Sequence, residues 1–203
     1  GPEGVCYRSD LFEKAGLPTD RAEVAKLMGT WEDYFATGEE FVQKMPDTAW
    51  YDSSTSLSQA MLNQVEFPFE TDDETVDVEN PELEAVYETV TDNIERGLSS
   101  KIAQWGDDWT AQFQNDGFAT MPCPGWMMGI IEGNSEGVDG WDMANAFPGG
   151  GGNWGGSFLT VPAQGDNVEE AKEVAAWLTA PEQQAKAFEA VGAFPSQVDA
   201  QDA

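Results

Sequence analysis

The sequence predicts an α/β fold that is rich in helices, and two observations support this. Short apolar segments typical of buried strands alternate along the chain with longer segments whose apolar residues recur at helical spacing. Strands interleaved with helices are typical of a sheet covered by helices. The 203 residues are enough for one large domain or two small ones, each with its own hydrophobic core.

The first half of the chain follows this alternation. We expect a strand within residues 4–8 and a turn at 13–18. Thr30 then caps a helix with an aromatic-rich apolar face, because an acid, Asp33, lies three positions on. Further on, 47–64 predicts a strand, a polar turn and a helix.

The helix that begins at Asn80 and Pro81 has the clearest periodicity of the chain, and Gly97 is placed to end it. The second half continues with a short helix, a strand with a Pro-Gly turn and a helix, a strand, and two amphipathic helices. These lie in order at 107–117, 118–131, 157–162, 166–179 and 180–195.

Composition excludes several classes of protein. Nine basic residues against 38 acidic ones give a formal charge of −29, which repels nucleic-acid phosphates, so we expect no nucleic-acid partner. The acids are spread along the chain, which favours a solvated acidic surface. No apolar run approaches the length of a membrane span, and the first residues are not a signal peptide. The targeting segment of an exported protein would therefore lie outside this chain.

The absence of histidine removes the commonest general base and metal ligand, and with it every Ser-His or Cys-His nucleophile pair. Cys6 and Cys123 cannot build a zinc site without such partners, and neither lies in a C-x-x-C motif. We expect no metal, cofactor or catalytic residue. Both cysteines lie in apolar stretches typical of buried strands, which favours a Cys6–Cys123 disulfide in an exported protein over two free thiols.

The segment "FPGGGGNWGGSF" at 147–158 surrounds one asparagine and one tryptophan with six glycines. A phosphate-binding loop requires a lysine and leads into a helix, whereas this loop lacks the lysine and leads into the strand expected at 157–162. Glycines allow the backbone to approach a neighbour closely while one indole projects. The loop therefore suits either a sugar-binding surface or a hinge.

Two groups of tryptophans differ in their surroundings. Trp31 and Trp177 lie on apolar helical faces, so we expect both in the core. Trp126 and Trp154 lie in turns, which favours stacking on a ligand. Sugar rings present an apolar face that stacks on indole, and their hydroxyls need donors and acceptors such as Asn153 and the side chains of the turn at 52–53.

Several segments together resemble a known family. In order they are "CYRSDLFEKAGLP", "TWEDYFATGEEF", "GFATMPCPGWMMGIIE", "PGGGGNWGGSFLTVP" and "WLTAPEQQ". This combination is similar to the family 1 extracellular solute-binding proteins, the sugar receptors of bacterial ABC importers. The resemblance covers most of the chain, although no single motif is diagnostic.

The resemblance implies a periplasmic-binding-protein-like fold of type II, in which two α/β lobes close about a hinge on a sugar. Members are roughly twice as long as this chain. The chain is therefore expected to supply mostly one lobe. Residues 1–154 would form most of the second, C-terminal lobe, and 155–203 would supply the strand that crosses the hinge and helices of the first, N-terminal lobe.

The resemblance also implies where ligand contacts lie. Trp126 corresponds to an aromatic residue that commonly stacks on the sugar, and the loop at the hinge brings in Trp154. The remaining candidates are Asn153, Gly155 and Gly156 in that loop, the turn Tyr51, Asp52 and Ser53, and Asp108, for which a helix-capping role is an equal alternative.

The function implied is that of a monomeric receptor, extracellular or periplasmic, which delivers a neutral sugar or oligosaccharide to a membrane permease and is not an enzyme. Any membrane association would come from a lipid anchor outside this chain. A glycosidase with paired carboxylates is the alternative, but 38 acidic residues allow many pairs and no catalytic motif is present. A carbohydrate-binding module is disfavoured by the helices, since such modules are typically rich in strands.

Overall fold

The computed structural model describes residues 1–71, 73 and 75–201. Its four strands form one mixed sheet in the order β2-β3-β1-β4, in which β1 is antiparallel to both β3 and β4 and β2 is parallel to β3. The strands are β1 (Glu3–Arg8), β2 (Ala49–Tyr51), β3 (Phe118–Pro124) and β4 (Trp141–Ala144). The α/β prediction is confirmed.

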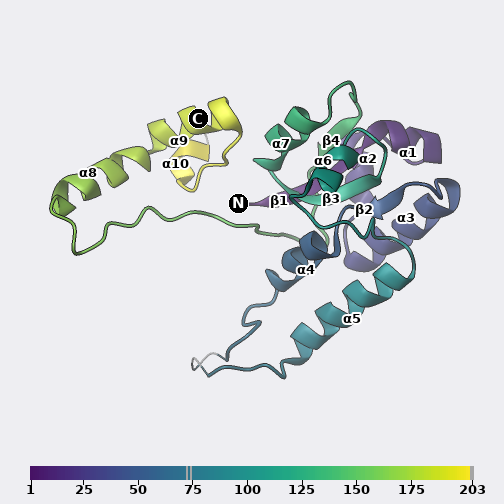
Figure 1. Cartoon of the computed structure of the whole chain (residues 1–203), viewed down its shortest axis with the longest axis horizontal. Helices are drawn as coiled ribbons and strands as arrows, with labels where there is room; N and C mark the ends of the chain where they lie inside the picture. Colours follow the sequence, from purple (N-terminus) through teal and green to yellow (C-terminus); the bar gives the residue numbers. More distant parts are fainter. Residues whose placement is uncertain (72, 74, 202–203) are drawn as a thin grey trace.

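Within the described residues, seven helices lie around the sheet, and three more form a separate group joined to it by a long extended segment (Figure 1). None of the helices in the described part of the chain is long and apolar enough to cross a membrane. The first seven are α1 (Ser9–Ala15), α2 (Arg21–Lys26), α3 (Trp31–Lys44), α4 (Ser54–Leu62), α5 (Pro81–Glu95), α6 (Asp107–Gln112) and α7 (Met127–Asn134). The last three are α8 (Val168–Leu178), α9 (Pro181–Val191) and α10 (Val198–Gln201).

Side-chain caps fix the beginnings of the central helices. The Thr30 hydroxyl accepts a hydrogen bond of 3.0 Å from the Asp33 amide at the start of α3, as predicted. Asn80 accepts one of 2.9 Å from the Glu82 amide at the start of α5, and Pro81 fills the first helical position. These caps satisfy backbone N–H groups that have no partner inside the helix.

The sheet separates two hydrophobic clusters. Because successive side chains of a strand point to opposite faces, Val5 and Tyr7 of β1 join the larger cluster and Cys6 joins the smaller one. The larger cluster lies under α1, α3, α4 and α5, with the fully buried Trp50 stacked against Phe12. The smaller cluster lies under α6 and α7 and carries the candidate site.

Some of the predicted elements are wrong. The turn expected at 13–18 begins later, because α1 continues to Ala15 and ends at Gly16 in the left-handed conformation. The strand expected at 157–162 is absent from the structure, and no described segment pairs with it. Its Phe158 is 92% exposed. Trp177, expected in the core, is 59% exposed on α8. The sequence did not predict β4 or the short helices α1, α2 and α10.

Cys6 of β1 and Cys123 of β3 are joined in a disulfide, with their Cα atoms 5.4 Å apart. The register of the antiparallel pair, in which Cys6 lies opposite Met121 and Gly4 opposite Cys123, makes the two cysteines diagonal neighbours on adjacent strands. The bond links positions 117 residues apart and so closes the chain between β1 and β3 into one loop.

The glycine-rich loop runs beside the first residues of the chain. The Glu3 amide donates to the Gly152 carbonyl at 3.1 Å, and the Trp154 amide donates to the Gly1 carbonyl at 2.9 Å. Pro2 and Asn153 form an antiparallel bridge between these two bonds. The two segments are thus paired like short strands.

Glycine is required where this loop passes Glu3. A Cβ atom on Gly152 would lie 2.6 Å from a Glu3 carboxylate oxygen and 2.4 Å from the Phe147 ring. Both Glu3 carboxylate oxygens are buried and accept no hydrogen bond within the described residues. Burial therefore raises the pKa of Glu3 from 4.5 to about 7.

We predict that replacing both Cys6 and Cys123 with alanine lowers the free energy of unfolding by roughly 2–5 kcal/mol, because the unfolded chain loses a constraint across a long loop. Urea denaturation of oxidised protein measures this difference. A reducing agent should produce a similar loss in the wild type and none in the double variant. An unchanged denaturation midpoint after reduction would contradict the prediction.

We predict that the contribution of Glu3 to the free energy of unfolding falls as the pH rises from about 4.5 to about 7. The folded state keeps the Glu3 proton up to a higher pH than the unfolded chain, so deprotonation favours unfolding in this range. Glu3→Gln should flatten the dependence, measured by urea denaturation at several pH values. Glu88→Gln, on an exposed position of α5, is the control. Equal slopes for all three proteins would argue against the assignment.

Candidate functional site

Four tryptophans from three separate parts of the chain meet at one end of the sheet, and we call Trp105, Trp109, Trp126 and Trp154 the tryptophan cluster. Trp105 contacts the other three. Its ring centroid lies 5.1 Å from Trp109, 6.2 Å from Trp126 and 6.3 Å from Trp154. The Trp105 and Trp126 rings are nearly parallel, whereas Trp126 and Trp154 meet edge to face at 5.7 Å.

Exposure differs strongly within the tryptophan cluster. Trp109 is buried and Trp154 is only 8% exposed, so these two indoles support the others from below. Trp126 is half-buried, and Trp105 is 57% exposed. Trp105 is therefore the indole with the most surface free for a ligand. Trp126, the residue expected to stack on a ligand, lies beside it.

Trp105 was missed by the sequence analysis, although the signal was present. It directly precedes Gly106 in the loop before α6, and position in a turn is the criterion that selected Trp126 and Trp154. Its backbone has a φ of 69°, in the left-handed region that a bulky residue rarely adopts. Such conformations persist where surrounding contacts hold them, and they cluster at functional sites.

Asp52 lies beneath this loop and is fully buried. Its Oδ2 accepts hydrogen bonds from Gln104 Nε2 at 2.8 Å and from Trp109 Nε1 at 2.9 Å, and its Oδ1 accepts one of 2.6 Å from the Ser56 hydroxyl. Burial raises the pKa of Asp52, although these three hydrogen bonds oppose the rise. Because Asp52 has no exposed surface and its oxygens accept hydrogen bonds from the protein, neither oxygen is free to contact a ligand.

The other predicted residues of this turn are also buried. Tyr51 ends β2 with no exposed surface, and burial raises the pKa of its hydroxyl to about 12. Ser53 caps α4, since its hydroxyl accepts from the Thr55 amide at 3.1 Å. Asp108 is exposed in the first turn of α6, whose capping position is taken by Gly106. Direct ligand contact by these residues remains an untested prediction.

Asn153, Gly155 and Gly156 line a cavity of about 710 Å³ between the glycine-rich loop and the chain around α9 and α10. Its volume is in the range of small-molecule sites. The remaining described lining residues are Gly1, Pro2, Gly152, Ser157, Phe158, Thr179, Gln184, Ala187, Ala193, Phe194, Pro195, Ser196 and Gln201. We call this space the hinge-side cavity, after the hinge that the family resemblance implies.

The tryptophan cluster adjoins the hinge-side cavity. A Cβ atom on Gly1 would lie 3.8 Å from Trp126 Cδ1, and one on Gly125, the residue before Trp126, would lie 3.5 Å from the Gly192 carbonyl oxygen. Gly155 and Gly156 have φ values of 69° and 140°, which only glycine adopts readily. The glycines thus bring backbone close to the space in front of the indoles.

The side chains that line the hinge-side cavity are uncharged. None of its described lining residues has a charged side chain, although the chain as a whole has a formal charge of −29. Amides, hydroxyls, backbone groups and aromatic rings supply its surface. No group of three or more acidic or cysteine side chains in the described part of the chain is arranged to hold a metal ion. Such a surface suits an uncharged ligand with many hydroxyls.

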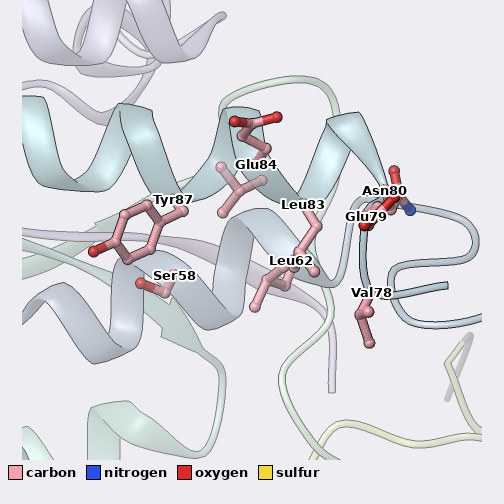
Figure 2. Close-up of a pocket in the computed structure, with 9 residues that line it drawn as sticks. Ser58, Leu62, Val78, Glu79, Asn80, Leu83, Glu84 and Tyr87 are labelled. Atoms are coloured by element: carbon pink, nitrogen blue, oxygen red, sulfur yellow. The ribbon is translucent and has the colours of Figure 1, made fainter.

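A second cavity, of about 720 Å³, lies between α4 and α5 and contains none of the predicted site residues. Figure 2 shows Ser58 and Leu62 of α4 on one side and Leu83 and Tyr87 of α5 on the other. Val78, Glu79, Asn80, Glu84 and Val86 complete its described lining. Among the described residues, only α4, α5 and the residues just before α5 line this second cavity, whereas three separate parts of the chain line the hinge-side cavity.

The chain matches a family model described as "Bacterial extracellular solute-binding protein" over residues 1–203. A comparison with curated proteins gives no match. Among solved structures, an extracellular solute-binding protein of family 1 is 50% identical and superimposes with a TM-score of 0.92. The match covers all of this chain and 52% of that one.

Two more distant structures share the fold. The sugar-binding protein MalE from Xanthomonas citri is 16% identical, with a TM-score of 0.76 and coverage of 99% of this chain and 52% of that one. A Streptococcus pneumoniae solute-binding protein in complex with the blood group A-trisaccharide is 20% identical, with a TM-score of 0.66 and coverage of 100% and 51%.

The chain thus spans about half the length of the solved relatives that it matches. The family model covers every residue, and the 50% identical structure extends the likeness along the whole chain. Together these findings confirm the resemblance seen in the sequence. The chain belongs to the bacterial extracellular solute-binding protein family.

Proposed function

We propose that this chain is part of a receptor of an ABC importer, which binds a neutral sugar or oligosaccharide and delivers it to a membrane permease. The observation that carries the proposal is the pairing of an uncharged cavity with the exposed indole of Trp105 and the half-buried one of Trp126. An indole face provides stacking for a sugar ring, and the neutral polar lining provides partners for its hydroxyls.

The distant relatives support a sugar as the class of ligand. One of them is named as a sugar-binding protein, and another was solved with a trisaccharide. The receptor would act outside the cytoplasmic membrane, at the cell surface or in the periplasm, as a monomer. Any lipid anchor would lie outside this chain.

We further propose that residues 1–154 form most of one lobe and that 155–203 belong to the other. The paired segments at 1–3 and 152–154 would then be two passages of the chain through the hinge, side by side. Neither α8 nor α9 has a buried residue, and both expose large apolar side chains. These include Val174, Trp177, Leu178, Phe188 and Val191. The rest of the first lobe would cover these faces.

The glycosidase alternative lacks support. Such an enzyme needs two carboxyl groups on either side of the scissile bond. No carboxylate is among the described residues that line the hinge-side cavity, and the buried carboxylate of Asp52 is fully engaged by the protein. A binding protein therefore fits this site better than a hydrolase does.

We predict that Trp105→Ala and Trp126→Ala each weaken sugar binding by the full-length receptor by roughly 1–3 kcal/mol, because each removes an aromatic face from the ligand. Isothermal titration calorimetry against a panel of disaccharides and trisaccharides measures the loss. Tyr87→Ala is the matched control, since Tyr87 is 72% exposed but lines the cavity between α4 and α5. Loss of binding in the control alone would move the site to that cavity.

We predict that the 203-residue chain on its own binds the same sugar at least about a hundredfold more weakly than the full-length receptor, because half of the contacts would be missing. The same calorimetric titration compares the two proteins. Circular dichroism of the isolated chain establishes that its helices and sheet have formed. Equal affinities would rule out a ligand held between two lobes.

A further inference from the structure

We propose that Asp52 is a positioning residue, which holds the loop 99–106 so that Trp105 presents its indole to the ligand. This inference rests on the proposed function, because it concerns the same binding surface. It differs from the sequence-based expectation, in which Asp52 contacted the ligand itself.

The carboxylate of Asp52 accepts hydrogen bonds from residues on both sides of Trp105 in the sequence. Its Oδ2 accepts from Gln104 Nε2 at 2.8 Å, one residue before Trp105, and from Trp109 Nε1 at 2.9 Å, four residues after it. The Trp109 ring in turn packs against Trp105, with centroids 5.1 Å apart. One buried oxygen atom therefore fixes the residue before the exposed indole and the ring beneath it.

The beginning of the loop is attached to the same residue. The Ser100 hydroxyl donates to the Asp52 backbone carbonyl, and the Ser100 amide donates to the Tyr51 carbonyl at 3.0 Å. Between these attachments the chain adopts positive φ at two residues other than glycine, 60° at Lys101 and 69° at Trp105. Side chains disfavour this backbone conformation, so it needs contacts from outside the loop.

Asp52 itself is anchored from below. Its Oδ1 accepts from the Ser56 hydroxyl at 2.6 Å within α4, and its side chain has no exposed surface. The Ser56 hydroxyl also lies 2.8 Å from the Ser53 carbonyl. The loop that carries Trp105 is thus tied through one carboxylate to the first turn of a core helix.

The hydrogen-bond pattern identifies a conservative replacement. Asparagine at position 52 can keep its oxygen toward Gln104 and Trp109 and turn its amide NH₂ toward Ser56, whose hydroxyl can accept as well as donate. Alanine leaves the N–H donors of Gln104 and Trp109 without an acceptor. Asp52→Asn should therefore retain the loop, whereas Asp52→Ala should release it.

The experiment uses the full-length receptor and two readouts. The first is the exciton-coupled circular dichroism of Trp105 with its neighbouring indoles, assigned by its loss in Trp105→Phe. The second is calorimetric affinity for the sugar that the wild type binds best in a panel of disaccharides and trisaccharides. Leu57→Ala, which removes a buried apolar side chain of the larger cluster from the same helix, controls for general destabilisation.

We expect Asp52→Ala to lose the exciton signal and about tenfold or more in affinity. Adding Trp105→Phe to Asp52→Ala should weaken binding no further, since both changes remove one contribution. Asp52→Asn should keep the signal and the affinity within about threefold of the wild type. Leu57→Ala should lower the melting temperature and leave both readouts in place.

An intact exciton signal in Asp52→Ala would overturn the proposal, and so would additive losses in the double variant. If Asp52→Ala does not fold, Gln104→Ala replaces it, because it removes one of the two donors at a half-buried position. If the wild type binds no sugar of the panel, the proposed function fails. The exciton signal still decides whether Asp52 holds Trp105.

Discussion

The antiparallel pairing of β1 with β3 is the constraint on which the rest of the structure depends. It places Cys6 and Cys123 within reach of a disulfide, and it delivers Trp126 to the turn that follows β3. The residues that lead into β1 lie beside the glycine-rich loop because β4, the strand before that loop, pairs with the other edge of β1, and this brings Trp154 against Trp126. The two edges of β1 therefore bring together Trp126, Trp154 and the edge of the hinge-side cavity.

Charge is distributed so that it does not oppose binding of a neutral ligand. A formal charge of −29 lies on a chain whose hinge-side cavity has no charged side chain among its described lining residues. Two carboxylates beside the site are withdrawn from solvent: Asp52 is enclosed by three donors, and Glu3 is buried with a raised pKa. The acidic surface favours solubility. Under the proposed function, stacking and neutral hydrogen bonds would supply the specificity.

The sequence predicted most elements because their signals are local. The caps at Thr30 and Asn80 are short-range patterns, and the structure forms both hydrogen bonds. The strand expected at 157–162 failed because a strand needs a neighbour, and none lies within the described residues. The burial of Asp52 could not be predicted either, because it depends on a contact with Trp109, which lies 57 residues away in the sequence. Trp105 could have been found from its place before a glycine, but its exposure depends on tertiary packing.

The central claim is that a sugar binds where the tryptophan cluster meets the hinge-side cavity. A crystal structure of the full-length receptor with a bound disaccharide or trisaccharide tests it most directly. We expect a sugar ring stacked on Trp105 or Trp126, hydroxyls within hydrogen-bond distance of the glycine-rich loop, and Asp52 buried behind the indoles without touching the ligand. A sugar bound between α4 and α5, or one that makes no aromatic contact, would contradict it.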